Sequence, residues 1–170
     1  MNFAEKFRDI PDFPRQGIIF KDITTFLKDG KAFQEAVNCL AKNYQGQKID
    51  LIVSPESRGF ILGSALAYAL GAGFAPVRKA GKLPAATIKV KYALEYGEDT
   101  LEIHQDALTK GMRVLVVDDV LATGGTTKAA AELVETLGGE IAGFAFLLEL
   151  AFLKGREKIA GYQIASLVVD

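Results

Sequence analysis

The sequence feature that most constrains the fold is an unbroken aliphatic run at residues 114–117, which leads into two adjacent aspartates. Branched apolar side chains without polar alternation are typical of a strand that is buried on both faces. Such strands belong to parallel sheets covered by helices on each side, because the crossover between parallel strands is usually a helix. The run therefore predicts an α/β protein.

The rest of the chain alternates strand and helix patterns, as this fold class requires. Apolar residues at helical spacing predict helices over 31–44, 59–71 and 126–137. Short apolar runs predict strands over 49–53, 74–77, 113–117, 141–148 and 162–169, the first of them broken by Ser54 and Pro55. Two alternating runs, 87–94 and 100–104, predict a hairpin or a flexible flap. We expect a mostly parallel central sheet flanked by helices, with ligands bound where its strands end.

Composition limits the class of protein further. A chain of 170 residues, 49% of them apolar, predicts one domain over 1–170 with its own core. The balance of 20 Lys and Arg against 21 Asp and Glu leaves a net charge of −1, so we expect no nucleic-acid or membrane partner. The first residues lack the apolar run of a signal peptide, and no stretch would span a bilayer, so we expect a cytoplasmic protein.

The lone cysteine and histidine do not indicate a metal site. Apolar residues at helical spacing around Cys39 predict a buried structural thiol, and no Cys and His set has the spacing of zinc ligands. His104 ends an alternating run, where a surface or edge position is favoured over a general base. The flap is expected to be kept soluble by its acids, which are Glu98, Asp99, Glu102 and Asp106.

The aspartate pair and the loop after it carry the chemistry. Two adjacent carboxylates at a strand end are costly unless they meet a cation or hydroxyl groups, such as magnesium or a ribose. The loop then opens a helix with Ala122, Thr123, Gly124, Gly125, Thr126 and Thr127. Glycines let backbone amides converge on an anion, and the helix N-terminus adds partial positive charge. The pattern favours a ribose 5-phosphate site over a plain turn capped by threonines.

Residues 114–126 resemble the phosphoribosyl pyrophosphate (PRPP) signature of type I phosphoribosyltransferases. The resemblance extends to segments 11–14, 17–23, 56–60, 78–84, 94–97 and 153–158, which look like those of adenine phosphoribosyltransferases in the same order. It implies the type I phosphoribosyltransferase fold, with a small N-terminal base-binding hood (1–28) and a basic loop and flexible catalytic flap (79–106). The implied reaction joins adenine to PRPP and gives AMP and pyrophosphate, with Mg²⁺ as the cofactor.

The same resemblance implies a role for each site segment. PRPP and AMP would be held by Asp118, Asp119 and the loop 122–127, with magnesium held mainly by PRPP near the two acids. Pyrophosphate would be held by Glu56, Ser57 and Arg58, in a loop that often contains a non-proline cis peptide, together with Arg78, Lys79 and Lys82. The last three would act on a neighbouring subunit, which implies a homodimer. Adenine would contact Ile19, Phe20, Lys21 and Leu121, and the catalytic residues would be Glu95, Tyr96 and Arg58.

Other interpretations stay open at this stage. The Ser54–Arg58 region has an alternative, less favoured interpretation as a turn in which Arg58 pairs with an exposed carboxylate, and the basic run 78–91 has one as a solvated loop. The chain could transfer PRPP to another purine, such as xanthine or hypoxanthine and guanine. It could also be a PRPP-sensing regulator, although no basic helical extension for DNA binding is present.

Overall fold

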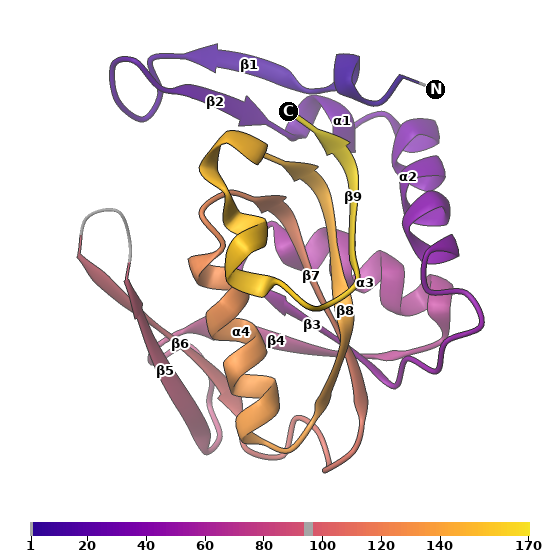
Figure 1. Ribbon diagram of the computed structural model, residues 1–170, viewed down its shortest axis with the longest axis vertical. Coiled ribbons are helices and arrows are strands. Elements are labelled where there is room, and N and C mark those ends of the chain that lie inside the picture. Colours follow the sequence, from indigo (N-terminus) through magenta and orange to yellow (C-terminus); the bar gives the residue numbers. More distant parts are fainter. Residues whose placement is uncertain (1, 94–96) are drawn as a thin grey trace.

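A computed structural model of the protein describes residues 2–93 and 97–170. Its described strands form one seven-stranded sheet in the order β5-β6-β4-β3-β7-β8-β9 and a separate two-stranded sheet, β1-β2 (Figure 1). Five strands of the large sheet are parallel: β4 (Gly73–Lys79), β3 (Leu51–Pro55), β7 (Arg113–Leu121), β8 (Glu140–Glu149) and β9 (Ile164–Val169). The antiparallel hairpin β5 (Thr87–Ala93) and β6 (Glu98–His104) extends the β4 edge. The expected α/β fold class is confirmed.

Helices cover the two faces of the large sheet (Figure 1). The face toward the viewer carries α4 (Gly125–Thr136) and the 3₁₀ segment η3 (Gly155–Ile159), while α2 (Gly30–Lys42) and α3 (Gly59–Leu70) lie on the opposite face. Residues 114–117 of β7 are fully buried and alternate between the two resulting cores. The prediction of a strand buried on both faces is therefore confirmed.

Two strands that contribute to the cavity, β3 and β7, run further than the sequence predicts. β3 does not break at Ser54 and Pro55 but continues through both, because Pro55 still pairs with Val77 of β4. The pairing of β3 with β7 ends at Val53, so the missing N–H of Pro55 costs no bond on that side. β7 runs on to Leu121 because β8 pairs with it that far, which places the aspartate pair inside a strand.

Cys39 is half-buried, and the prediction of a buried thiol is wrong. α2 buries Ala36, Val37 and Leu40. Since each helical residue is rotated by about 100° from the last, Cys39 lies at the margin of that stripe.

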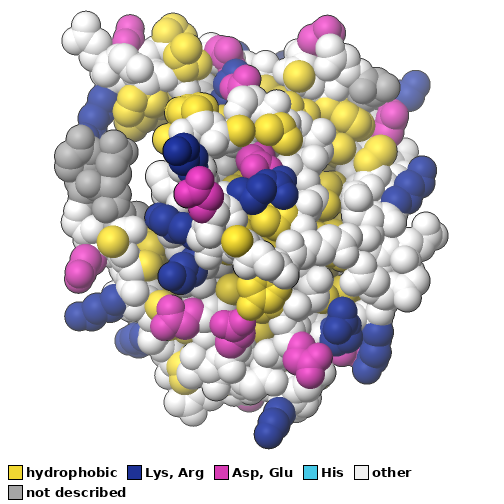
Figure 2. Space-filling model, in the orientation of Figure 1, with side chains coloured by type: hydrophobic (Ala, Val, Ile, Leu, Met, Phe, Trp, Pro, Cys, Tyr) yellow, Lys and Arg dark blue, Asp and Glu magenta, His cyan; other side chains and the backbone are white. Residues whose placement is uncertain are grey.

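The N-terminal hairpin, β1 (Arg8–Pro11) and β2 (Ile19–Asp22), lies over the end of the sheet where β7, β8 and β9 finish (Figure 1). It is preceded by η1 (Ala4–Lys6) and followed by the short α1 (Thr24–Leu27), while η2 (Ala151–Leu153) follows β8. No helix among the described residues is long and apolar enough to cross a membrane. On the α4 face, Lys and Arg side chains are intermixed with Asp and Glu (Figure 2).

A buried hydrogen bond joins the end of α2 to the sheet. The hydroxyl of Tyr44, a side chain only 1% exposed, donates to the Phe144 carbonyl of β8 over 2.6 Å. Burial raises the pKa of Tyr44 to about 12. A Cβ at Gly143 would lie 2.8 Å from the Tyr44 ring, so the glycine leaves room for the side chain.

We predict that Tyr44→Phe lowers the free energy of unfolding by about 1 kcal/mol, the usual net contribution of such a bond. Urea denaturation measures the change. Tyr162→Phe is the control, because its hydroxyl donates to Glu135 at the surface, and a change under about 0.5 kcal/mol is expected there. Equal effects of the two substitutions would contradict the buried bond's contribution.

Candidate active site

A cavity of about 570 Å³ lies at the carboxyl ends of β3 and β7, beneath the N-terminal hairpin. Sequence-predicted residues from three segments line it. They are Ile19, Phe20 and Lys21 of the hairpin, Glu56, Ser57 and Arg58 after β3, and Asp118, Asp119 and 122–127 from β7 to α4. The structure thus brings together segments that are far apart in the sequence, at the sheet edge where ligands of parallel sheets bind.

In the protein without a ligand, Arg58 offsets negative charge of the aspartate pair. Its Nε lies 2.6 Å from Oδ2 of Asp119, a carboxylate that is 4% exposed. The guanidinium also lies over the Phe20 ring, 5.4 Å from its centroid. Among the described residues, Asp119 Oδ2 has no hydrogen-bond partner besides this ion pair. Arg58 therefore pairs with a buried carboxylate and not with an exposed one.

Asp118 has a different environment from its neighbour. Burial raises the pKa of Asp118 well above its usual value, and the charge of Asp119 raises it further. One Asp118 oxygen accepts the backbone N–H of Asp119 over 2.9 Å. Because two close carboxylates ionise with difficulty, the pair favours a ligand that brings hydroxyl groups or positive charge.

The glycine-rich loop has the geometry of an anion site. Gly124 adopts the left-handed conformation at φ 78° and precedes the first residue of α4. A residue with a side chain rarely adopts this φ, so glycine is needed for the turn. The first amides of α4 are then free of helical partners and carry the positive end of the helix dipole toward the cavity.

The segment after β3 contains the expected non-proline cis peptide, between Glu56 and Ser57. Glu56 Oε1 accepts the backbone N–H of Lys79 over 2.7 Å and pairs with Arg78 over 3.3 Å. Lys79 Nζ in turn lies 3.1 Å from Asp99. Neither Arg78, Lys79 nor Lys82 lines the cavity.

Leu121 does not line the cavity, and the prediction of an adenine contact there is wrong. Its side chain is fully buried in the core beneath α4. Successive residues of a strand point to opposite faces, so Val120 reaches the cavity instead. Leu150, just beyond β8, lines it as well and was missed, although its position after a long apolar strand is a usable signal.

Glu102 is not a solubilising surface acid as predicted, because it is 1% exposed. It accepts the backbone N–H groups of Lys82 and Leu83, each over 3.1 Å. Burial raises the pKa of Glu102, but the backbone donors outweigh this and leave it below the usual value. Glu102 therefore anchors the basic loop, a role that the alternation of β6 gave no sign of.

His104 does not line the cavity. It is half-buried at the end of β6, where its Nε2 accepts the backbone N–H of Ala85 over 3.4 Å. The predicted catalytic residues Glu95 and Tyr96 lie outside the described residues.

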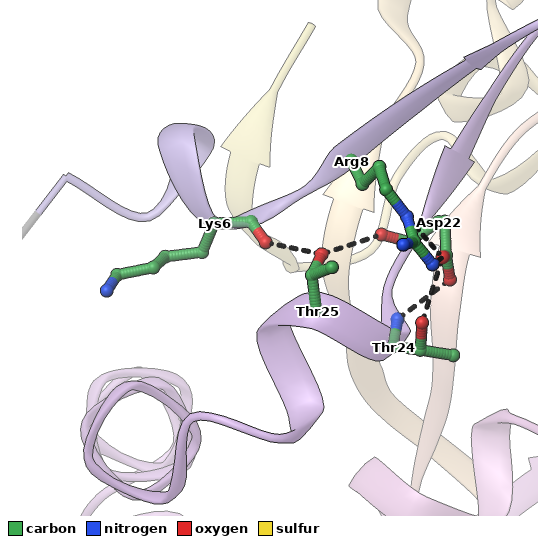
Figure 3. Close-up of polar contacts among 5 residues, drawn as sticks. All are labelled: Lys6, Arg8, Asp22, Thr24 and Thr25. Carbon is green, nitrogen blue, oxygen red and sulfur yellow. Dashed lines mark hydrogen bonds and ion pairs between the residues drawn. The ribbon is translucent and has the colours of Figure 1, made fainter.

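The hairpin above the cavity is fastened at the end away from its turn. There, Asp22 accepts Arg8 Nε over 3.1 Å and both the backbone N–H and the hydroxyl of Thr24, while Thr25 donates to the Lys6 carbonyl (Figure 3). In the next pair of the register, Lys21 Nζ lies 2.9 Å from Asp9, and it also lies 3.0 Å from Asp170, beyond the end of β9. These contacts hold the backbone of β2 over the aspartate pair.

A protein-family model described as a phosphoribosyl transferase domain matches residues 24–163. The chain belongs to this family. Among curated relatives, the adenine phosphoribosyltransferase of Clostridium perfringens is 56% identical over 168 residues, which cover 99% of this chain and 98% of the relative. That of Caldanaerobacter subterraneus subsp. tengcongensis is 59% identical over 167 residues, covering 98% and 96%. Within the family, the chain is one of the adenine phosphoribosyltransferases.

Solved structures agree. The adenine phosphoribosyltransferase of Thermoanaerobacter pseudethanolicus superposes with a TM-score of 0.95 at 57% identity, over 99% of this chain and 98% of that one. The Saccharomyces cerevisiae protein, complexed with an imino-altritol bisphosphate and adenine, gives a TM-score of 0.91 at 43% identity over 97% and 96%. The type I phosphoribosyltransferase fold is confirmed.

We predict that Asp22→Asn destabilises the protein at neutral pH and that the difference from the unaltered protein shrinks in acid. The Thr24 amide and the Arg8 guanidinium hold the pKa of Asp22 at about 2. A lowered pKa contributes stability above the unfolded value of about 4, which is lost as pH falls through the folded value. Urea unfolding at several pH values between about 5 and 2 measures it. Asp106→Asn, at an exposed site after β6, is the control. A pH-independent difference for Asp22→Asn would refute the assignment.

Proposed function

We propose that this chain transfers the phosphoribosyl group of PRPP to adenine, giving AMP and pyrophosphate in purine salvage. The observation that carries the proposal is one cavity that unites the aspartate pair, the glycine-rich loop and an apolar hairpin roof. Membership of the adenine phosphoribosyltransferases supports it. Adenine N9 forms a bond to the anomeric carbon while the bond from that carbon to pyrophosphate breaks, and the N9 proton is released.

The donor occupies the β7 side of the cavity in this proposal. The amides of Gly124, Gly125 and Thr126 bind the 5-phosphate at the positive end of α4, and the aspartates bind the ribose hydroxyls. Holding the sugar at both ends fixes the anomeric carbon for in-line attack. Asp118, whose pKa burial and the Asp119 charge raise, accepts hydrogen bonds from the ribose hydroxyls in this arrangement.

Magnesium is part of the proposal. The aspartates offer carboxylate oxygens of the kind that Mg²⁺ prefers, and Asp119 Oδ2 is buried with no partner besides its ion pair with Arg58 among the described residues. No group of three or more candidate ligands occurs among residues 2–93 and 97–170, so PRPP itself would supply most of the coordination. When bound, the ion neutralises charge on the departing pyrophosphate. Arg58 supplies positive charge to the same group from the protein side.

The base occupies the roof side. Ile19 and Lys21 offer main-chain groups to the adenine edge, while Phe20, Val120 and Leu150 form apolar walls. The two salt bridges of Lys21 keep its ammonium with Asp9 and Asp170, so its backbone is the part available to the base. Glu95 near adenine N7 and Tyr96 as a closing residue complete the proposed catalytic set, in a flap that excludes water during transfer.

The proposed active unit is a homodimer. α3 is apolar nearly all around its circumference, yet Ile61 is 44% exposed and Tyr68 is 92% exposed. Helices of this kind are normally buried on every side, so a second copy covering α3 would complete its packing. Arg78, Lys79 and Lys82, which do not line their own cavity, are then available to the partner's pyrophosphate. We place the enzyme in the cytoplasm, since PRPP is too highly charged to cross a bilayer unaided.

We predict that AMP forms from adenine, PRPP and magnesium, and that guanine, hypoxanthine and xanthine give no nucleotide. Separation of the nucleotides by chromatography measures it. IMP, GMP or XMP as the main product would move the specificity to another purine. PRPP binding without any product would make the chain a sensor of PRPP and contradict the proposal.

We predict different kinetic effects for the flap and the aspartate pair. Glu95→Gln should slow turnover on the order of 100-fold with little change in PRPP affinity, because the Glu95 carboxylate acts on adenine, the acceptor, and not on PRPP. The double substitution Asp118→Asn and Asp119→Asn should weaken PRPP binding at least about tenfold, through lost charge-assisted hydrogen bonds. Steady-state kinetics and calorimetric titration with PRPP separate the two effects. A large loss of PRPP affinity in Glu95→Gln would argue against its assigned role.

A further inference from the structure

A segment far along the chain supports the glycine-rich loop from behind. Gly155, the first residue of η3, is buried against it. A Cβ built on Gly155 would lie 2.2 Å from the Ala122 carbonyl oxygen and 3.0 Å from the Gly124 nitrogen. A Cβ on Gly124 would lie 2.5 Å from the Gly155 carbonyl oxygen. The two glycine backbones are thus in direct contact, with no room for one further carbon atom on either side.

The need for glycine at 155 is steric. Gly124 requires glycine for its left-handed φ of 78°, whereas the φ of Gly155 is not positive. Alanine could therefore adopt the Gly155 backbone conformation, and only the contact with the loop opposes it. The neighbour Lys154, at φ 54°, is held in the left-handed region that non-glycine residues rarely occupy. Such a conformation persists only where the surrounding structure imposes it.

Strong polar contacts hold this segment in place. Arg156 Nε donates to Glu149 Oε1 over 2.8 Å, and the Ser166 hydroxyl donates to Glu149 Oε2 over 2.6 Å. Glu149 ends β8 and is only 4% exposed, so the pair is fixed to the sheet. Ile159, at the other end of η3, is buried in the core with α4. The segment is therefore anchored to β8 and β9 by polar contacts and to the core beneath α4 by Ile159.

We propose that Gly155 is a positioning residue for phosphoribosyl binding, which acts by holding the backbone of residues 122–125 against the cavity. This inference rests on the proposed function of the loop. A loop with adjacent glycines has many accessible conformations, and fixing it during binding would cost conformational entropy. Contact with an anchored segment removes that freedom before the ligand arrives, so the amides already converge on the phosphate.

The contact acts on one half of the site only. Ala122 and Gly124 belong to the phosphate side, whereas Ile19 and Phe20 of the base side lie on the N-terminal hairpin, which has its own fastening. Displacement of the loop should therefore weaken binding of the sugar phosphate and leave the base site intact. A general loss of stability would not discriminate between the two halves.

The test is Gly155→Ala, with Gly30→Ala as the matched control. Gly30 starts α2, has no positive φ, and a Cβ there meets nothing within 4 Å. We expect Gly155→Ala to raise the calorimetric Kd of ribose 5-phosphate and the KM of PRPP at least about tenfold. A change of this size corresponds to the loss of about one hydrogen bond to a charged group. The KM of adenine should change less than about twofold, which is within ordinary context effects. Unchanged ribose 5-phosphate affinity in a folded Gly155→Ala protein would overturn the proposal.

Arg156→Gln provides a second route that adds no atom to the contact. Arg156→Gln frees the segment from Glu149, so we expect it to raise the Kd of ribose 5-phosphate as well. This measurement remains possible even if Gly155→Ala does not fold. No rise in Arg156→Gln would then reject the proposal. If the unaltered protein forms no AMP while Gly155→Ala still weakens ribose 5-phosphate binding, the positioning role stands and the proposed reaction fails.

Discussion

The burial of β7 on both faces is the constraint on which the rest of the molecule depends. Residues 114–117 alternate between two separate cores, with α4 above and with α2 and α3 below. A slip of one residue would draw Asp118 into the core, where an uncompensated carboxylate is very costly. The register of β7 is therefore fixed. It places the aspartates and the loop after them at the carboxyl end of the central parallel strands. The charged part of the site is thus carried by a strand that is buried on both faces.

The parts of the fold that could be predicted from the sequence are those with a local signature. The β7 run, the helical spacing in α2, α3 and α4, and the loop 122–127 each carry their own pattern, and each lies where it was expected.

The predictions that failed concern residues whose positions are set by contacts between distant segments of the chain. Leu121 was assigned to the wrong side because the end of β7 is set by its pairing with β8. Glu102 reads as one of several flap acids, and only the packing of the basic loop around it reveals a buried anchor. Nothing local distinguishes Gly155 from a surface turn, since its importance comes from a contact about thirty residues away.

Most charged groups of the site are compensated within the protein. Arg58 pairs with Asp119, Glu56 with Arg78, Lys79 with Asp99, and Lys21 with Asp9 and Asp170. An unpaired charge at a partly buried site has a high free-energy cost. Each of these pairs avoids that cost by giving both charges a partner. They also set a condition on ligands. A molecule that takes Arg58 or Asp119 must supply the charge or hydroxyl groups that the displaced partner provided, which favours a magnesium-bound diphosphate on a ribose over a simple anion.

The bond between Lys21 and Asp170 also matters for handling the protein in the laboratory. Asp170 follows β9, and its carboxylate lies 3.0 Å from an ammonium whose residue lines the cavity. A purification tag or fusion partner joined after Asp170 would begin beside the roof of the site and compete for the space around Lys21. The N-terminal end emerges on the far side of the roof, next to α1 and α2 (Figure 1). Attachment at that end, or surface immobilisation through it, keeps the approach to the cavity open.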